Sequence, residues 1–240
     1  MIPLHKRPFE QVTILTGAGI SAESGLVTFR DSGGLWEGSD PMEVASLPSL
    51  RANPRFVLDF YNQRRSQLSK VEPNESHIAI SELQNRFSGD VFLITQNVDD
   101  LHERAGSSQV CHMHGSLKKM TCEFCYEEMV ALELFYRDSA CPLCQKKGGL
   151  RPDVVFFGEM PKYLDEITDL LSKTDLFLAI GTSGVVYPAA GFVSEVNEYG
   201  GLTVEINKEK SENTHLFNIA YQGLATEEVP KFVEDLCNDS

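Results

Sequence analysis

Several kinds of segment are absent from this 240-residue sequence. It has no apolar run long enough to cross a bilayer, and its first ten residues lack the apolar core of a secretory signal. It also has no internal repeat and no low-complexity tract. We therefore expect a soluble, cytoplasmic protein that works away from membranes. Its oligomeric state is left open, with a monomer as the simplest expectation.

The sequence also has fewer basic than acidic residues. The 21 lysines and arginines stand against 35 aspartates and glutamates, which gives a net charge of −14. Because such a surface repels phosphate backbones, we expect no direct binding to nucleic acid. The charge suits a basic partner such as a lysine-rich protein segment, although acidity that serves only solubility is the simpler explanation.

What the chain does contain is enough apolar sequence for a substantial core, since 42% of its residues are hydrophobic. Four near-continuous apolar runs end in small or polar residues, and they are Val12–Thr16, Val91–Thr95, Leu176–Ile180 and Leu202–Ile206. Such runs are typical of strands buried on both faces, as in a parallel sheet. Open α/β sheets bind ligands at the carboxyl ends of their strands, so we expect these polar ends to line one crevice.

Helical patterns separate the predicted strands, which indicates an α/β fold. They cover residues 54–70, a stretch after Pro161, and residues 189–199 and 230–236. Two segments interrupt the alternation and are interpreted as insertions that build a smaller lobe. Within one unit of residues 1–240, we predict a large lobe from about 8–30, 77–116 and 150–240, and a small lobe from about 31–76 and 117–149.

A glycine-rich turn, Gly17-Ala18-Gly19-Ile20-Ser21-Ala22, follows the first predicted strand. Glycines there allow a tight turn and close approach of the backbone to a pyrophosphate. However, the acidic residue that usually ends the second strand of a dinucleotide site is missing. A glycine-rich segment with Phe29, Arg30 and Trp36 occupies that stretch and resembles a cofactor cover. The pattern indicates either an ordinary strand-to-helix turn or a variant nucleotide site.

Four of the six cysteines form two CxxC pairs with fifteen residues between the pairs. Two such pairs can supply four thiolates in a tetrahedron, which is the arrangement of structural zinc sites. Since four thiolates leave no position for water, the predicted role is structural. Two redox pairs or buried free thiols are the alternatives. The predicted ligands are Cys122, Cys125, Cys141 and Cys144.

Two histidines, His112 and His114, lie two residues apart. In a strand they would share one face, and a neutral imidazole there can act as a general base near neutral pH. The sequence alone does not choose between them, and a structural role is the more common case for a single histidine. The other four histidines have no supporting context, and we interpret them as structural.

A charged residue interrupts the apolar stripe of the helix predicted over 54–70. Arg64 falls on the stripe of Val57 and Leu68, and Tyr61 lies one turn before it. A guanidinium on such a face can bind a carboxylate in a bidentate manner, which indicates a pocket for a carboxylate-bearing ligand. An internal salt bridge or a snorkelling side chain is the alternative.

Short motifs along nearly the whole chain together resemble those of the sirtuins, the NAD-dependent protein deacylases. Each motif is weak alone, but their ordered co-occurrence is specific. The motifs are Gly17-Ala18-Gly19-Ile20-Ser21, Phe29-Arg30, Gln96-Asn97-Val98-Asp99, His114-Gly115, the two CxxC pairs, Phe157-Gly158-Glu159, Gly181-Thr182-Ser183 and Glu205-Ile206-Asn207. The resemblance implies a Rossmann-like NAD lobe and a small lobe with a helical part and a zinc ribbon.

The resemblance also implies roles for the matching residues, with His114 as the catalytic base. Asn97 and Asp99 are expected to hold the nicotinamide carboxamide. Val185, Val186 and Tyr187 are expected to pair with the substrate peptide as an added strand. The residues expected to bind NAD are Gly17, Ala18, Gly19, Ile20, Ser21, Phe29, Arg30, Trp36, Gln96, Asn97, Val98, Asp99, Gly181, Thr182, Ser183, Asn207 and Ala225.

The implied reaction consumes NAD. The acyl carbonyl oxygen attacks C1′ of the nicotinamide ribose, nicotinamide departs, and His114 is the general base for a ribose hydroxyl that attacks the resulting imidate. Water completes the transfer to give free lysine and O-acyl-ADP-ribose. The implied partners are acylated lysine side chains of other proteins. An ADP-ribosyltransferase and a non-catalytic zinc-ribbon binding module are the alternatives.

Tyr61 and Arg64 resemble the Tyr-x-x-Arg pair of the bacterial or archaeal sirtuin subgroup that removes succinyl and malonyl groups. Ala45 matches a small residue that widens the acyl pocket in that subgroup. The resemblance implies that Tyr61 and Arg64 bind the carboxylate of the acyl chain. Because an unpaired buried guanidinium is costly, we expect a preference for succinyl-lysine, with deacetylation retained to an unknown degree.

Overall fold

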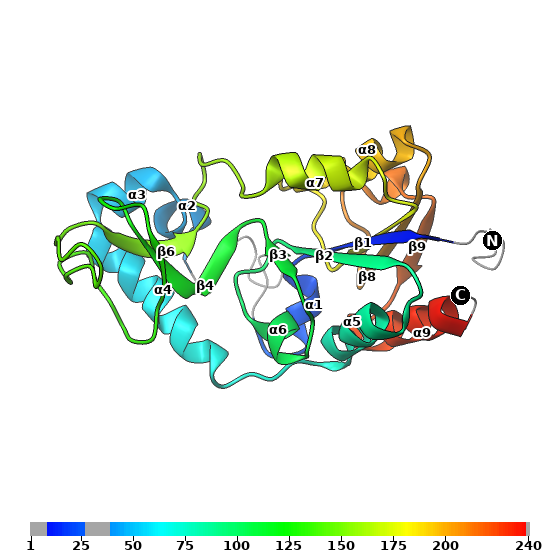
Figure 1. Cartoon of the computed structure of the whole chain (residues 1–240), viewed down its shortest axis with the longest axis horizontal. Coiled ribbons are helices and arrows are strands. Elements are labelled where there is room, and N and C mark those ends of the chain that lie inside the picture. The colour runs from blue at the N-terminus through cyan, green and yellow to red at the C-terminus, as the bar shows by residue number, and fades with distance from the viewer. Residues whose placement is uncertain (1–8, 27–38, 239–240) are drawn as a thin grey trace.

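The computed structural model describes residues 9–26 and 39–238, and the predicted site residues Phe29, Arg30 and Trp36 lie outside the described residues. Within these ranges the molecule is elongated and has two parts (Figure 1). The large lobe is a six-stranded sheet with its covering helices, and the small lobe is a three-stranded sheet beside three helices. Across the described ranges, none of the helices has the length and apolar character that a membrane span requires.

The strands of the large sheet are all parallel, in the order β3-β2-β1-β7-β8-β9. Their bounds are β1 (Gln11–Thr16), β2 (Asp90–Thr95), β3 (Val110–His112), β7 (Leu176–Ile180), β8 (Leu202–Asn207) and β9 (Ile219–Gln222). The four strands predicted from apolar runs are confirmed, and β3 and β9 complete the edges. Every residue of β7 is buried, as expected for a strand covered on both faces.

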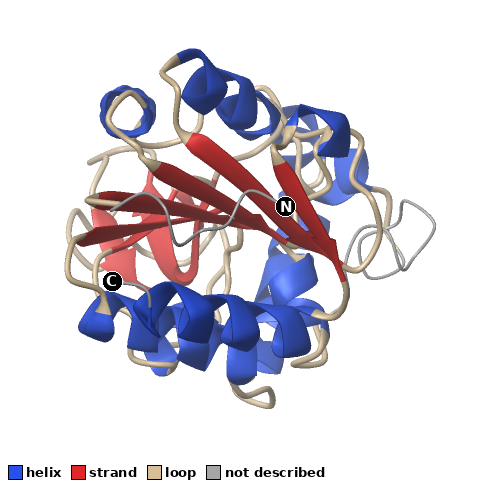
Figure 2. Cartoon of the chain, turned by 90° about the vertical axis from the view of Figure 1, so that its right-hand side faces the viewer, coloured by secondary structure: helices blue, strands red, loops and turns tan. Residues whose placement is uncertain are grey.

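Helices cover both faces of the large sheet, as Figure 2 shows. Two separate apolar cores result, one on each face. The covering elements are α5 (Glu75–Arg86) and α9 (Ala225–Asn238) on one face, and α7 (Leu164–Leu171), η2 (Ala189–Gly191) and α8 (Phe192–Glu198) on the other. The shorter elements of this lobe are α1 (Gly19–Ala22), α6 (Leu101–Arg104) and η3 (Thr214–Leu216).

The last helix begins earlier than the sequence predicts. The expected start is Pro230, but α9 begins at Ala225 and contains the proline. A proline at this position removes one hydrogen bond, to the Thr226 carbonyl. Burial of Val229 and Phe232 against the sheet offsets that loss, since each buried side chain of this size contributes about 1.5–3 kcal/mol.

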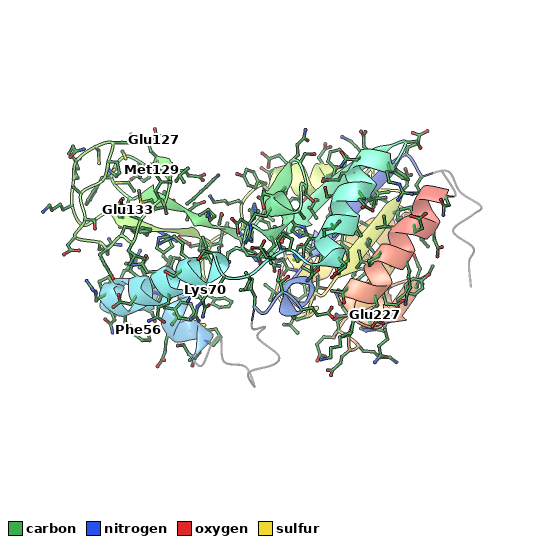
Figure 3. All side chains as sticks on the ribbon, turned by 90° about the horizontal axis from the view of Figure 1, so that it is seen from below. Phe56, Lys70, Glu127, Met129, Glu133 and Glu227 are labelled. Atoms are coloured by element: carbon green, nitrogen blue, oxygen red, sulfur yellow. The ribbon has the colours of Figure 1, made fainter. Side chains whose placement is uncertain are left out.

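The small lobe combines a helical part with the zinc ribbon. Its elements are α2 (Pro41–Val44), α3 (Leu47–Ala52), α4 (Pro54–Leu68), β4 (Gly115–Cys122), β5 (Glu128–Val130) and β6 (Leu150–Val154), the strands being antiparallel in the order β5-β4-β6. Both parts contribute to one apolar core. Figure 3 shows Phe56 and Lys70, from the α4 region, on one side of the small lobe and the ribbon residues Glu127, Met129 and Glu133 on the other.

The order of the large sheet reverses between β1 and β7. The chain runs outward from β1 through β2 to β3, then returns to β7 and runs outward through β8 to β9 on the other side. The register aligns Thr16 with Thr95 and Ile180, and Ile180 with Ile206, so four carboxyl ends form one row. Open α/β sheets bind ligands in the crevice at such a switch point.

Candidate functional site

Two glycine turns meet at the switch point. The Gly17 N–H donates to the Ile180 carbonyl, and the Gly19 N–H donates to the Gly181 carbonyl, each at 2.9 Å. A Cβ atom on Gly17 or Gly19 would lie 2.7 Å from the Gly181 backbone, and one on Gly181 would lie 2.5 Å from the Ile20 nitrogen. Gly181 also has a φ of +62°, which favours glycine. The close packing of the two turns therefore requires all three glycines.

Ser21 is the centre of a buried polar network below the Gly17–Gly19 turn. Its hydroxyl donates to a carboxylate oxygen of Asp99 at 3.1 Å, and the Asn97 side-chain amide donates to the Ser21 oxygen at 3.1 Å. The Nε2 atom of His77 lies 3.4 Å from the same hydroxyl. All four side chains are buried. The network joins α1 to the loop after β2 and to the start of α5.

Burial decides the charge state of this network. It raises the pKa of Asp99 to about 6, although hydrogen bonds from a backbone N–H and a serine hydroxyl, and the charge of His112, oppose the shift. Burial lowers the pKa of His77 to about 4. Burial, and then the charges of His77 and His112, lower the pKa of His102 as well. Near pH 7 the network therefore holds one carboxylate and two neutral imidazoles.

His77 and His102 are site residues that the sequence does not reveal. His77 closes a capping box with Asn74 at the start of α5, a place where glutamate or glutamine is usual. The Nε2 atom of His102 lies 2.9 Å from the Thr16 hydroxyl at the end of β1. The two imidazole rings are 4.9 Å apart. An asparagine followed three residues later by a histidine is the one local signal that could have found His77.

The loop Gln96–Asp99 after β2 joins the two lobes. Its first N–H donates to the Thr16 carbonyl at 2.9 Å, which fixes the loop to the end of β1. The Val98 carbonyl accepts a hydrogen bond from the Leu117 N–H at 2.8 Å, in β4. The Val98 side chain packs against the small-lobe core. The loop thus presents Asn97 and Asp99 to the Ser21 network, while Val98 contacts the other lobe.

His112 and His114 both turn their rings toward this loop. The Nδ1 atom of His114 lies 3.1 Å from the Gln96 carbonyl oxygen, and that of His112 lies 3.1 Å from the Asn97 carbonyl oxygen. Met113, between them, is buried in the core beneath the sheet. Because a carbonyl only accepts, each Nδ1 carries a proton. Burial lowers the pKa of His114, although its backbone hydrogen bond opposes the shift, so this ring is neutral near pH 7.

The ends of β7, β8 and β9 complete the row. The Asn207 side-chain amide donates to the Thr182 carbonyl at 2.6 Å. Ala225 begins α9, and its neighbour Thr226 donates to the Glu23 carboxylate at 2.8 Å, which ties this helix to the end of α1. The described residues that are predicted to bind NAD all follow or end β1, β2, β7, β8 or β9, and they are Gly17, Ala18, Gly19, Ile20, Ser21, Gln96, Asn97, Val98, Asp99, Gly181, Thr182, Ser183, Asn207 and Ala225.

The stretch after β7 carries apolar side chains that are open to solvent. Val185, Val186 and Tyr187 are 56%, 37% and 76% exposed, and none of them belongs to a described strand. Phe157 and Met160, in the loop after β6, are also exposed. The exposure of Val185, Val186 and Tyr187 leaves their predicted pairing with a peptide sterically open, and that role stays a prediction.

The predicted acyl-pocket residues lie beside the same loop. The Ala45 carbonyl accepts from the Phe157 N–H at 2.7 Å, and the Tyr61 and Phe156 rings are in edge contact with centroids 5.6 Å apart. Tyr61 is fully buried, and burial raises the pKa of its hydroxyl, which therefore keeps its proton. Arg64 places its guanidinium carbon 4.9 Å from the centre of a phenylalanine ring on the same helix.

The four cysteines converge in the zinc ribbon. Their sulfur atoms all lie within 4.8 Å of one another, with 3.7 Å between Cys122 and Cys144 and 3.9 Å between Cys125 and Cys141. Zinc–sulfur bonds in a tetrahedron place the sulfurs about 3.8 Å apart. The spacing therefore fits one zinc ion, and four thiolates make that ion structural.

Two equivalent turns present the thiolates. In each turn, the backbone N–H of the residue after a CxxC pair donates to the backbone carbonyl of the first cysteine of that pair. The Tyr126 N–H donates to the Cys122 carbonyl at 2.8 Å, and the Gln145 N–H donates to the Cys141 carbonyl at 2.9 Å. Both residues have a left-handed backbone, with φ values of 60° and 61°. The same local conformation thus occurs twice around one sulfur cluster. This repetition supports the assignment of all four cysteines as ligands.

Known proteins share both the sequence and the fold of this chain. The Sir2 family model matches residues 17–188. A relative from Caulobacter vibrioides, named NAD-dependent protein deacylase, is 49% identical over 233 residues, which cover 96% of this chain and 98% of the relative. A solved Sir2 homolog–NAD complex has a TM-score of 0.88 at 35% identity, covering 98% of this chain and 92% of that one. Sir2 bound to an acetylated peptide has a TM-score of 0.82 at 26% identity, covering 97% and 95%. The chain therefore belongs to the Sir2 family, as its motifs predict.

Proposed function

We propose that the chain is an NAD-dependent protein lysine deacylase that transfers the acyl group to ADP-ribose and releases nicotinamide. The observation that carries this proposal is the convergence of four strand ends at one switch point, with His114 beside them. The relative from Caulobacter vibrioides is named NAD-dependent protein deacylase, which supports the proposal. Among structures of the same fold, one Sir2 homolog is solved with NAD and another Sir2 protein with an acetylated peptide.

The row of strand ends offers complementary groups along the length of NAD. The turn Gly17–Gly19 has no side chain larger than a methyl group, so a pyrophosphate can approach its backbone. Asn207 would bind the adenine ribose, and Ala225 would lie near the adenine. Asn97 and Asp99 would hold the nicotinamide carboxamide, whose N–H groups need an acceptor such as an ionised carboxylate.

His114 is the general base of the proposed reaction. Its Nδ1 atom donates to the Gln96 carbonyl, which leaves the lone pair at Nε2. Gln96 is itself held by the end of β1, so the ring has a fixed orientation. NAD, when bound, supplies the ribose carbon that the acyl oxygen attacks and a ribose hydroxyl. The neutral ring accepts the proton of that hydroxyl at Nε2.

The substrate is an acylated lysine side chain of another protein, and its backbone would pair with residues 185–187 as an added strand. None of the six cysteines forms a disulfide, which fits a reducing compartment, and we keep the cytoplasm as the proposed location.

We extend the proposal to desuccinylation and demalonylation, beside deacetylation, from the residues near the acyl end of the substrate. Ala45 leaves room because its side chain is a methyl group. The buried Tyr61 hydroxyl keeps its proton and can donate a hydrogen bond to a carboxylate. Arg64, one turn further along α4, can donate two hydrogen bonds to the same carboxylate. Together these groups favour an acyl chain that ends in a negative charge.

Arg64→Met tests the acyl pocket with matched acetyl, malonyl and succinyl peptides, NAD, and product detection by mass. We expect kcat/KM for the two acidic acyl groups to fall about 10- to 100-fold, because the substitution removes a charge-assisted hydrogen-bond donor. Deacetylation should change by less than about threefold. Arg55→Met, an exposed position on the same helix, is the matched control and should change none of the three rates. Equal losses for all three peptides would refute this role of Arg64.

A further inference from the structure

His112 makes contacts that the proposed reaction does not use. Its Nδ1 atom lies 3.1 Å from the Asn97 carbonyl oxygen, and its Nε2 atom lies 2.6 Å from a carboxylate oxygen of Glu103, on α6. The His112 side chain is only 15% exposed, whereas that of Glu103 is 44% exposed. The pair thus connects a surface helix to the loop that carries Asn97 and Asp99.

Both partners of His112 are hydrogen-bond acceptors. A carbonyl oxygen and a carboxylate accept hydrogen bonds and donate none, whereas a neutral imidazole has a single N–H group. The two contacts together therefore require the doubly protonated, positively charged ring. His114 differs, because within residues 9–26 and 39–238 only its Nδ1 atom has a hydrogen-bond partner. Two histidines on one face of the same stretch thus carry different charges.

Electrostatics agree with this geometry. Burial by itself lowers the pKa of His112, but the hydrogen bond and charge of Glu103, a backbone carbonyl and the charge of Asp99 together raise it above its ordinary value. In return, the charge of His112 lowers the pKa of Asp99 against the effect of burial. The other titratable groups nearby are His102, which is neutral, Asp100, whose charge raises the pKa of Asp99, and Lys119, which faces Glu103. The imidazolium is thus the cation that favours the ionised form of Asp99.

An exposed ion pair with only a structural role would leave the nicotinamide end of the site unchanged when removed, since such pairs contribute little. This pair ends instead on the Asn97 carbonyl. The side chain of Asn97 donates to Ser21, and Ser21 donates to Asp99. Loss of His112 would therefore remove the hydrogen-bond partner of the Asn97 carbonyl and raise the pKa of Asp99.

We propose that His112, paired with Glu103, is a positioning residue for the nicotinamide end of the NAD site. It fixes the loop that carries Asn97, and it keeps Asp99 as a carboxylate that accepts hydrogen bonds from the carboxamide. This inference rests on the proposed function, in which these two residues hold nicotinamide. It assigns His112 no part in binding the adenosine half of NAD, whose proposed site lies at the ends of β7 and β8.

The test is His112→Ala in the full chain with its zinc. The measured quantities are kcat and KM for NAD with an acetyl peptide, the inhibition constant of nicotinamide, and the affinity for ADP-ribose, which lacks nicotinamide. We expect KM for NAD and the nicotinamide inhibition constant to rise about tenfold, the worth of one charge-assisted hydrogen bond. The affinity for ADP-ribose should stay unchanged.

Glu103→Gln keeps the shape of the partner and removes its charge, so it should raise the same two constants by a smaller factor. His215→Ala, at an exposed histidine of η3, is the matched control and should change neither. The inference is overturned if His112→Ala keeps the wild-type KM for NAD, or if ADP-ribose affinity falls by the same factor as nicotinamide affinity. Wild-type protein that releases no nicotinamide would refute the proposed function, and this inference with it.

Discussion

The zinc ribbon takes its functional groups from one short segment, whereas the site at the carboxyl ends of the large sheet's strands takes them from several distant segments. The ribbon takes its four thiolates from one short stretch, residues 122–144, through two copies of the same turn. The edge gathers groups from β1, β2, β7 and β8, and its turns pack backbone against backbone. A metal site of the first kind depends on local spacing. A nucleotide site of the second kind depends on topology.

The two regions should therefore fail in different ways. Loss of a thiolate removes a bond to the metal and affects the ribbon as a unit, because the ribbon has little core of its own. Loss of a contact at the edge affects the neighbouring turn, while the parallel sheet and its two cores remain. Three substitutions, in order of expected effect, test this contrast.

Cys125→Ser should have the largest effect. Zinc binding contributes about 10–16 kcal/mol to the folding free energy of small zinc domains at pH 7. Because a tetrad without one thiolate should not retain its metal, the ribbon of the variant should unfold locally. We expect about one equivalent of zinc in the wild-type protein and almost none in the variant. Hydrogen exchange should show lost protection in the ribbon and retained protection in the large sheet. Cys111→Ser, at a thiol outside the tetrad, should keep its zinc, and a full equivalent in Cys125→Ser would contradict the assignment.

Gly181→Ala should destabilise the sheet edge by about 4 kcal/mol, from a left-handed backbone and a collision with the Ile20 nitrogen. Urea unfolding measures the loss. Gly200→Ala separates the two causes, because Gly200 has a φ of +83° but nothing within 4 Å of the added carbon. That control should cost only about 1 kcal/mol. Equal costs for the two variants would show that the turns do not pack as described.

Asp99→Asn should have the smallest effect, and a stabilising one. Burial raises the pKa of Asp99 to about 6, whereas an unfolded aspartate has a value of about 3.9. The folded state thus holds the proton more tightly and loses stability as pH rises from about 4 to about 6. The variant removes that loss, so it should be more stable than the wild type by up to about 3 kcal/mol at pH 7.5.

The difference in unfolding free energy between Asp99→Asn and the wild type should vanish below about pH 4, where both side chains are neutral. Asp90→Asn, at the exposed start of β2, is the matched control and should leave the free energy of unfolding at pH 7.5 unchanged. If the Asp99→Asn variant were less stable than the wild type at pH 7.5, the claim that the buried, ionised carboxylate destabilises the folded protein would be wrong.

The same contrast explains what the sequence could predict. Strands β1, β2, β7 and β8 are recognisable because burial on both faces makes them continuously apolar, and the ribbon because its CxxC spacing is local. Strand β3 is not recognisable in this way because it has only three residues. Helix α5 is not recognisable because a histidine stands where a capping box usually has glutamate or glutamine.

The different charges of His112 and His114 could not be predicted from the sequence either. They depend on Glu103, which belongs to α6 and meets His112 only in the folded chain. The network around Ser21 is a further case, because its members come from α1, α5 and the loop after β2. The protonation state of each side chain depends on the residues that contact it in the folded chain, and these contacts cannot be predicted from the spacing of residues in the sequence.

The central claim is that one edge of the sheet binds NAD and brings His114 to it. The most direct measurement is a mass analysis of the products from purified protein, NAD and an acyl-lysine peptide, for the wild type and for His114→Ala. The account predicts free lysine peptide, nicotinamide and O-acyl-ADP-ribose in equal amounts from the wild type, and no deacylated peptide from the variant. Equal deacylation by both proteins, or loss of the acyl group without consumption of NAD, would contradict it.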